Sequence, residues 1–160
     1  MRPEHLTSDE ALESFLRGFE AGSLPKAEWT HGAHVAAAAY YLHGSLHGSL
    51  HGSAQDGAYD TAYDSVLPAI RQRIQAFNLA VGGANTATSG YHETLTRFWL
   101  RVVAAFLLQR QPSSGLEAAR QAVAEFGEQR ALHSLYYSGD VVKDSAARLG
   151  WREPDLRPLP

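Results

Sequence analysis

The chain has 160 residues, 44% of them hydrophobic, so it can bury one core but leaves little room for a second domain. Its 14 basic and 17 acidic residues give a net charge of −3, a balance that argues against binding to a nucleic-acid backbone. The absence of cysteine excludes disulfides, thiolate nucleophiles and thiolate metal ligands.

No segment has the pattern of a membrane anchor or a secretion signal. The longest apolar run, Val102 to Leu108, is far too short to span a bilayer, and residues 1–13 are polar and acidic. We therefore expect a cytoplasmic protein with neither nucleic acid nor a membrane as partner. Charged residues make up 19% of the chain, slightly fewer than usual, which leaves apolar surface for a possible homodimer.

Helix signals dominate the chain from its start. Thr7 and Glu10 form a capping-box pattern that predicts the beginning of a first helix, and Gly22 ends it. Pro25 is placed to open a second helix, which continues through an alanine block to about Leu42.

Two longer helices are predicted in the middle of the chain. The third helix carries an apolar stripe and ends at Gly82, while Pro68 either kinks it or marks its start. That stripe comprises Val66, Ile70, Ile74, Phe77 and Val81. The fourth helix is predicted from about Gly90 to Gln109.

Two shorter helices are predicted toward the C-terminus. Ser114 and Glu117 form a second capping pattern that opens a fifth helix, and a short sixth helix is expected between Ser138 and Leu149. Alternating apolar and polar residues typical of strands are not clear anywhere. We therefore predict an all-α fold in which residues 1–160 form a single compact bundle of five to six helices.

Two segments are predicted not to be helical. Residues 43–57 contain a near-perfect repeat of His, Gly and Ser, which is typical of a flexible loop. We interpret this repeat as an expansion in a tolerant loop rather than as a metal site. Residues 151–160 contain three prolines, which predict an extended tail.

The first motif with chemical potential spans Glu28 to His34. His31 and His34 are three residues apart, so on a helix both imidazoles can point at one ion. Glu28 lies three residues before His31 and could add an oxygen ligand, a spacing also used in di-iron bundles. The alternative is that both histidines simply hydrogen-bond to carboxylates or to the backbone.

The second motif is the pair His92 and Glu93, which follows a run of turn and capping residues. This placement predicts that both lie in the first turn of the fourth helix, where free N–H groups lower the pKa of a nearby histidine. Glu93 has three possible roles: a metal ligand, a general base acting on metal-bound water, or an ion-pair partner of Arg97 four residues later.

Together the motifs predict a metal site in the interior of the bundle. His31, His34 and His92 would supply three nitrogen ligands and leave one coordination position open, as in catalytic sites. Zn(II) fits these ligands most easily, while Fe(II), Mn(II), Ni(II) and Co(II) also bind imidazole and carboxylate.

Other side chains near the motifs are candidates for supporting the ligands or for binding substrate. Trp29 and Trp99 are expected to wall the site rather than to react. The candidates for the supporting role are Glu28, Tyr41, Tyr91 and Arg97.

The paired motifs also resemble those of a known group of proteins. Trp29-Thr-His31-x-x-His34, followed by an alanine-rich helix, and the run Tyr-His-Glu-Thr-Leu-Thr at residues 91–96 are similar to motifs of an uncharacterised bacterial all-helical family. The resemblance covers residues 29–108 and matches all four predicted ligand and base positions. It implies no reaction and no substrate.

The resulting functional prediction is a metal-dependent hydrolase or lyase that acts on a small molecule. One alternative is a thiol-dependent transferase, by architectural analogy with DinB-like proteins. Another is a regulatory or interaction module that binds a metal or a ligand such as haem without catalysis. In a further alternative, the histidines do not come together in the fold and the protein is an interaction domain.

Overall fold

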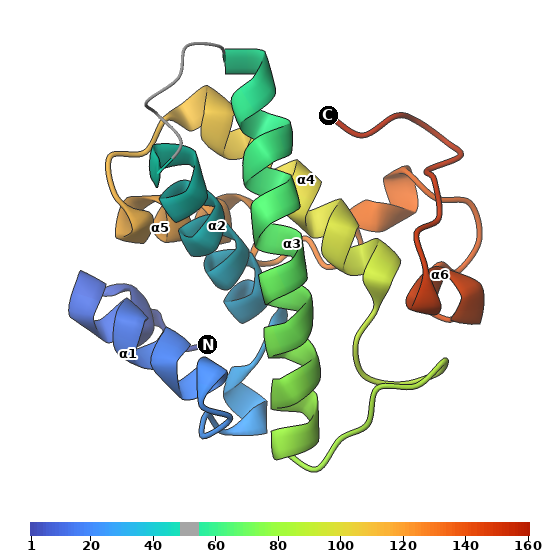
Figure 1. Cartoon of the computed structure of the whole chain (residues 1–160), viewed down its shortest axis with the longest axis horizontal. Coiled ribbons are helices and arrows are strands. Elements are labelled where there is room, and N and C mark those ends of the chain that lie inside the picture. Colours follow the sequence, from blue (N-terminus) through green and yellow to red (C-terminus); the bar gives the residue numbers. More distant parts are fainter. Residues whose placement is uncertain (49–54) are drawn as a thin grey trace.

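The computed structural model describes residues 1–48 and 55–160 of the chain (Figure 1). These residues contain six α-helices and no strand, which confirms the predicted all-α fold. The helices are α1 (Asp9–Glu20), α2 (His31–Gly48), α3 (Gln55–Ala80), α4 (Glu93–Arg110), α5 (Gly115–Phe126) and α6 (Ser145–Leu149). Short 3-10 helices occur at Pro3–Leu6, Lys26–Glu28 and Leu132–Leu135.

The alanine-rich helix α2 is the centre of the bundle. It packs against α3, α4 and α5, and Ala36 to Ala39 are at most 4% exposed. Their small side chains allow three helices to approach α2 closely, because little volume separates the backbones. In Figure 1, α3 runs from top to bottom in front of α4, with α2 beside it on the left and α1 at the lower left.

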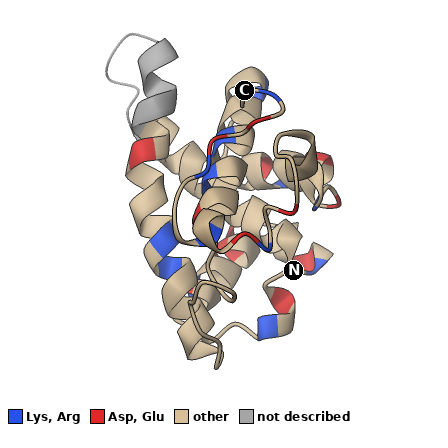
Figure 2. Ribbon diagram, turned by 90° about the vertical axis from the view of Figure 1, so that its right-hand side faces the viewer, with Lys and Arg blue, Asp and Glu red and all other residues tan. Residues whose placement is uncertain are grey.

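The segment after α5 folds back against α4. Helix α6 packs on α4, and the chain beyond it continues without helix to residue 160, with bends at residues 155–157. Figure 2 views this side of the molecule and shows acidic and basic positions interspersed along the segment and the helices behind it. None of the described helices is long and apolar enough to cross a membrane.

Several predicted helix boundaries are corrected by the structure. Of the loop expected at 43–57, residues 43–48 are helical in α2 and residues 55–57 are helical in α3, whereas residues 49–54 lie outside the described residues. Helix α3 continues through Pro68 instead of starting there. The second helix begins at His31, because Pro25 opens only a 3-10 turn.

Two caps illustrate how local the helix signals are. Ser114 Oγ accepts the Glu117 N–H at 3.1 Å, so the predicted start of α5 is confirmed. The start of α1 is displaced by one residue, since Ser8 rather than Thr7 accepts the Ala11 N–H at 3.2 Å. The short sixth helix expected between Ser138 and Leu149 is found at Ser145–Leu149, at the end of that range.

Candidate functional site

A cavity of about 480 Å³ lies between α2, α3 and α4. Its polar lining includes His31 and His34 from the first turn of α2, and His92 immediately before α4. The spacing argument placed these three histidines at one site, and all three do border this cavity. Lys26, on the 3-10 turn before α2, is the only described lining residue that carries a full charge at neutral pH.

Aromatic rings form much of the cavity wall. The Trp29 ring stacks on Phe19, with ring centroids 3.8 Å apart, and lies 5.5 Å from Phe77 of α3. Trp99 of α4 lines the cavity from the other side and lies 4.6 Å from the His31 ring. Trp29 and Trp99 therefore take the walling positions expected from the sequence.

His34 is held in one tautomer by the backbone. Its Nδ1 lies 2.8 Å from the Thr30 carbonyl oxygen, and because a carbonyl only accepts, Nδ1 carries the proton. Burial lowers the pKa of His34 to about 4, so the ring is neutral at pH 7. Nε2 then keeps its lone pair, and it makes no hydrogen bond with any residue in the described part of the chain.

His31 is oriented in a similar way by a different element. Its Nε2–H donates to the Phe126 carbonyl at the end of α5, with a distance of 3.1 Å. Burial lowers the pKa of His31, and the bond to Phe126 opposes that effect only in part. A neutral His31 therefore has Nδ1 as its remaining acceptor.

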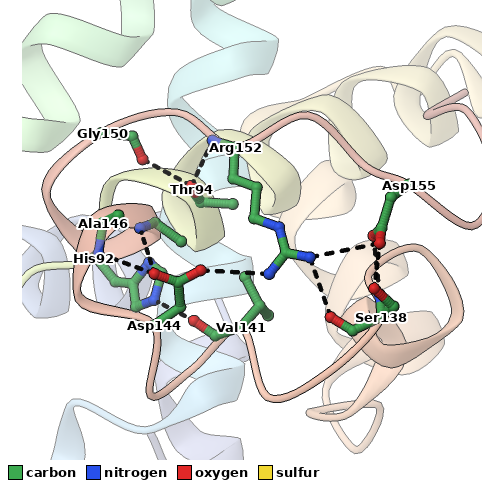
Figure 3. Close-up of polar contacts among 10 residues, drawn as sticks. His92, Thr94, Ser138, Val141, Asp144, Ala146, Gly150, Arg152 and Asp155 are labelled. Atoms are coloured by element: carbon green, nitrogen blue, oxygen red, sulfur yellow. Dashed lines mark hydrogen bonds and ion pairs between the residues drawn. The ribbon is translucent and has the colours of Figure 1, made fainter.

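His92 differs from the other two because both of its ring nitrogens already have partners. It is the N-cap of α4, where Nδ1 accepts the Leu95 N–H at 3.3 Å. Its Nε2–H donates to the Val141 carbonyl at 3.0 Å (Figure 3). This corrects the prediction that His92 lies in the first turn as a metal ligand, because no lone pair is left for an ion.

The three histidines do not form the predicted ligand set in this arrangement. Within residues 1–48 and 55–160, no group of three or more His, Asp or Glu side chains is placed to hold a metal ion. His31 and His34 each retain one nitrogen for a ligand, whereas the His92 imidazole caps a helix. At most two of the three predicted nitrogen ligands are thus free.

Glu93 is committed to an ion-pair network. Its carboxylate accepts two bonds from Arg71, at 2.5 and 2.9 Å, one from Arg97 Nε at 2.7 Å and one from the Tyr91 hydroxyl at 2.8 Å. Burial raises the pKa of Glu93, but these hydrogen bonds outweigh it and the net pKa is lowered. Of the three roles predicted for Glu93, the one present in the structure is the ion pair with Arg97. Glu93 does not line the histidine cavity.

The remaining predicted site residues divide into two groups. Tyr91 lines the cavity, whereas Tyr41 and Glu28 do not. The Tyr41 hydroxyl donates to Glu20 of α1 at 2.7 Å. Glu28 is paired with Arg2 at 2.6 Å. The supporting roles predicted for Tyr41 and Glu28 are therefore corrected, since both side chains are engaged elsewhere.

Sequence reasoning missed residues that line this cavity and one that lies outside it, beside Glu93. Asn78 and Thr96 line the cavity, and Asn78 could have been found because it follows Ile74 by four residues on the predicted apolar stripe. Arg71 could not have been found, because its pairing with Glu93 joins two helices across 22 residues of sequence.

Comparison with known proteins adds no family. No family model matches the chain, and neither a curated protein nor a solved structure is significantly similar to it. The resemblance of the paired motifs to a bacterial family stays a prediction, and the functional argument rests on the cavity itself.

Proposed function

We propose that the protein binds a small, mostly apolar molecule with an aromatic ring in the histidine cavity, and that His34 accepts a hydrogen bond from it. The observation that carries this proposal is an aromatic-walled cavity containing a neutral imidazole whose Nε2 has no partner in the described structure. This corresponds to a ligand-binding module, which the sequence left open as an alternative to an enzyme.

The size and lining of the cavity support a small organic ligand. Its volume of about 480 Å³ lies within the range of roughly 300–1,000 Å³ that is usual for small-molecule sites. Trp29, Phe77 and Trp99 offer ring faces and edges to a flat ligand, and aromatic contacts of this kind favour offset or edge-on packing. These side chains therefore contribute most binding free energy with a ligand that is itself planar and apolar.

The polar atoms restrict which apolar molecule fits best. A hydroxyl or N–H on the ligand can donate to His34 Nε2, which otherwise meets no donor among the described residues. A net contribution of about 1 kcal/mol for such a bond corresponds to roughly a fivefold gain in affinity. Lys26 is exposed, so a fully charged group would find its counter-charge only on an exposed side chain.

Two nearly isosteric probes test this proposal. Indole carries an N–H donor and benzothiophene does not, so calorimetric titration should show both binding, with indole about fivefold tighter. The variant His34→Asn keeps a donor for the Thr30 carbonyl but lacks Nε2, and it should lose the preference for indole. His133→Asn, which changes a histidine outside the cavity, is the matched control and should keep that preference.

The proposal fails if the wild-type protein binds neither probe saturably at their solubility limits. It also fails in its hydrogen-bond part if His34→Asn retains the full preference for indole. A change in affinity for both probes alike would indicate altered packing against the aromatic wall rather than loss of the bond.

The metal-dependent enzyme remains a second candidate, and one observation favours it. His31 and His34 border the same cavity, and each donates its other ring N–H to a backbone carbonyl, as metal-binding histidines usually do. A Zn(II) ion there would polarise a substrate carbonyl or lower the pKa of a bound water. His92 and Glu93 would take no part, because both are already bonded.

Metal titration separates this candidate from simple ligand binding. If His31 and His34 are a metal site, Co(II) and Zn(II) should bind at one equivalent, and either His31→Ala or His34→Ala should abolish that binding. The control His133→Ala should not change it. Equal binding by wild type and both variants would contradict a metal site at α2 and would leave the indole test unaffected.

A further inference from the structure

A second cavity, of about 390 Å³, lies on the other side of Tyr91. It is bordered by α3, by the loop at Asn85 and Thr86, by the start of α4 and by the C-terminal segment around Trp151. Tyr91 lines both cavities, so it forms part of the wall between them. The two cavities are therefore neighbours, but Tyr91 is the only described residue that lines both of them.

The lining of this second cavity is strongly basic. Arg71, Arg97 and Arg148 border it together with a single acid, Glu93, so three positive charges against one negative leave a net charge of +2. The whole chain has a net charge of −3. A basic cleft in an acidic protein concentrates positive potential where low-dielectric walls limit screening, and such a cleft attracts small anions.

The arginines are not all neutralised by Glu93. Arg71 makes two bonds to this carboxylate, but Arg97 uses only Nε. Neither Nη group of Arg97 donates a hydrogen bond to a residue that the structure describes. The guanidinium lies 5.7 Å from the centroid of the Trp151 ring, a contact that leaves its N–H groups available for an oxyanion.

Arg148 adds positive charge without a counter-ion. Its Nη1 donates to the carbonyls of Gly90 and Tyr91, at 2.9 and 3.3 Å, and its Nη2 donates to Val142 at 3.0 Å. These partners are neutral, and Arg148 forms no ion pair with any carboxylate of the described residues. The guanidinium is thus fixed beside the cavity with its full charge.

We propose that this second cavity binds the oxyanion group of a small molecule, a phosphate or a carboxylate, through the two Nη groups of Arg97. Planar guanidinium groups bind such oxyanions through two parallel N–H bonds, and the charge of Arg148 adds to the attraction. The cavity is larger than a bare phosphate ion, so it has room for a small organic group as well. This site is independent of the ligand proposed for the histidine cavity.

Titration with inorganic phosphate and, separately, with acetate tests this site. Calorimetry in a buffer without competing oxyanions should show one saturable site for at least one of these ions. Arg97→Gln should weaken that binding about tenfold or more. This variant leaves Glu93 with its bonds from Arg71 and Tyr91, so the fold should tolerate the change.

The matched control is Arg110→Gln, which removes the same charge from an exposed residue at the far end of α4. It should bind phosphate or acetate like the wild type. Equal weakening in both variants would overturn the proposal, because it would indicate a response to net charge alone. Absence of saturable binding of both ions to the wild type would overturn it as well.

A second variant tests the sign of the electrostatic argument. Glu93→Gln removes the one negative charge among the described lining residues, so a correctly folded variant should bind the anion severalfold more tightly than the wild type. Weaker binding by a variant whose circular dichroism spectrum matches the wild type would contradict the proposed site.

Discussion

Lowering the pH should destabilise the protein through His34 within a defined window. The pKa of a free histidine is about 6.5, whereas burial lowers the pKa of His34 to about 4. Between these two pKa values, His34 therefore binds a proton in the unfolded chain but not in the folded state. The contribution of His34 to the free energy of unfolding should be fully present above pH 6.5 and should fall as the pH drops toward 4. Below pH 4 it should level off, because His34 is then protonated in both the folded and the unfolded state.

The size of this effect follows from the difference between the two pKa values. A gap of about 2.5, at about 1.4 kcal/mol for each unit, corresponds to a full loss of about 3.5 kcal/mol, of which about 3 kcal/mol is reached by pH 4. That is a large share of the roughly 5–15 kcal/mol that usually stabilises a folded domain. Protonation of this one ring should therefore be visible in equilibrium unfolding.

Urea unfolding of the wild type and of His34→Asn at several pH values between 7 and 4 measures the effect. His31 and His92 also have pKa values lowered by burial, so the wild-type curve alone contains more than one contribution. The difference between wild type and His34→Asn isolates His34, and it should change by about 3 kcal/mol across the window. A difference that stays constant with pH would refute the reasoning.

Three further predictions concern the framework around the two cavities. Glu93→Ala leaves two arginines without their partner and should cost about 3 kcal/mol in urea unfolding; a loss below about 1 kcal/mol would contradict a structural role for the ion pair. Gly90→Ala should cost at least about 1–3 kcal/mol, because φ is +77° and a Cβ would lie 2.0 Å from the Ala84 oxygen; unchanged thermal stability would exclude this backbone conformation. Thr94→Val removes the hydroxyl that bonds Gly150 and Arg152 and should cost about 2 kcal/mol, with faster hydrogen exchange at the Arg152 amide, whereas Thr94→Ser should retain most of the protection.

The elements predicted best from the sequence are those fixed by neighbouring residues. The cap at Ser114 is correct because it depends only on the residues that follow it within one turn. The start of α2 was misplaced because Pro25 suits a 3-10 turn as well as an α-helix, and the Thr30 hydroxyl instead accepts the Ala33 N–H at 3.4 Å. A local sequence pattern therefore narrows the possible starts of a helix but does not decide which residue begins it.

The sequence grouped three histidines that border one cavity, but it did not predict which of their ring nitrogens already have hydrogen-bond partners, for a related reason. Helical spacing brings His31 and His34 to one face, but the direction of each ring depends on which carbonyl it reaches. His31 reaches Phe126, 95 residues away, and His92 reaches Val141, 49 residues away. Neither partner is visible in a motif, so the imidazole nitrogens left for a ligand could not be deduced from the sequence.

The attachment of the C-terminal segment to the start of α4 has a consequence for how the molecule forms during synthesis. Val141 bonds the His92 ring, and Thr94 bonds Gly150 and Arg152 through contacts that span 49–58 residues (Figure 3). Long-range contacts of this kind form late in folding because they require long loops to close. A nascent chain has to extend past residue 152 before all of these bonds can form, so the wall of the histidine cavity at His92 is fixed only after the C-terminal segment has been made.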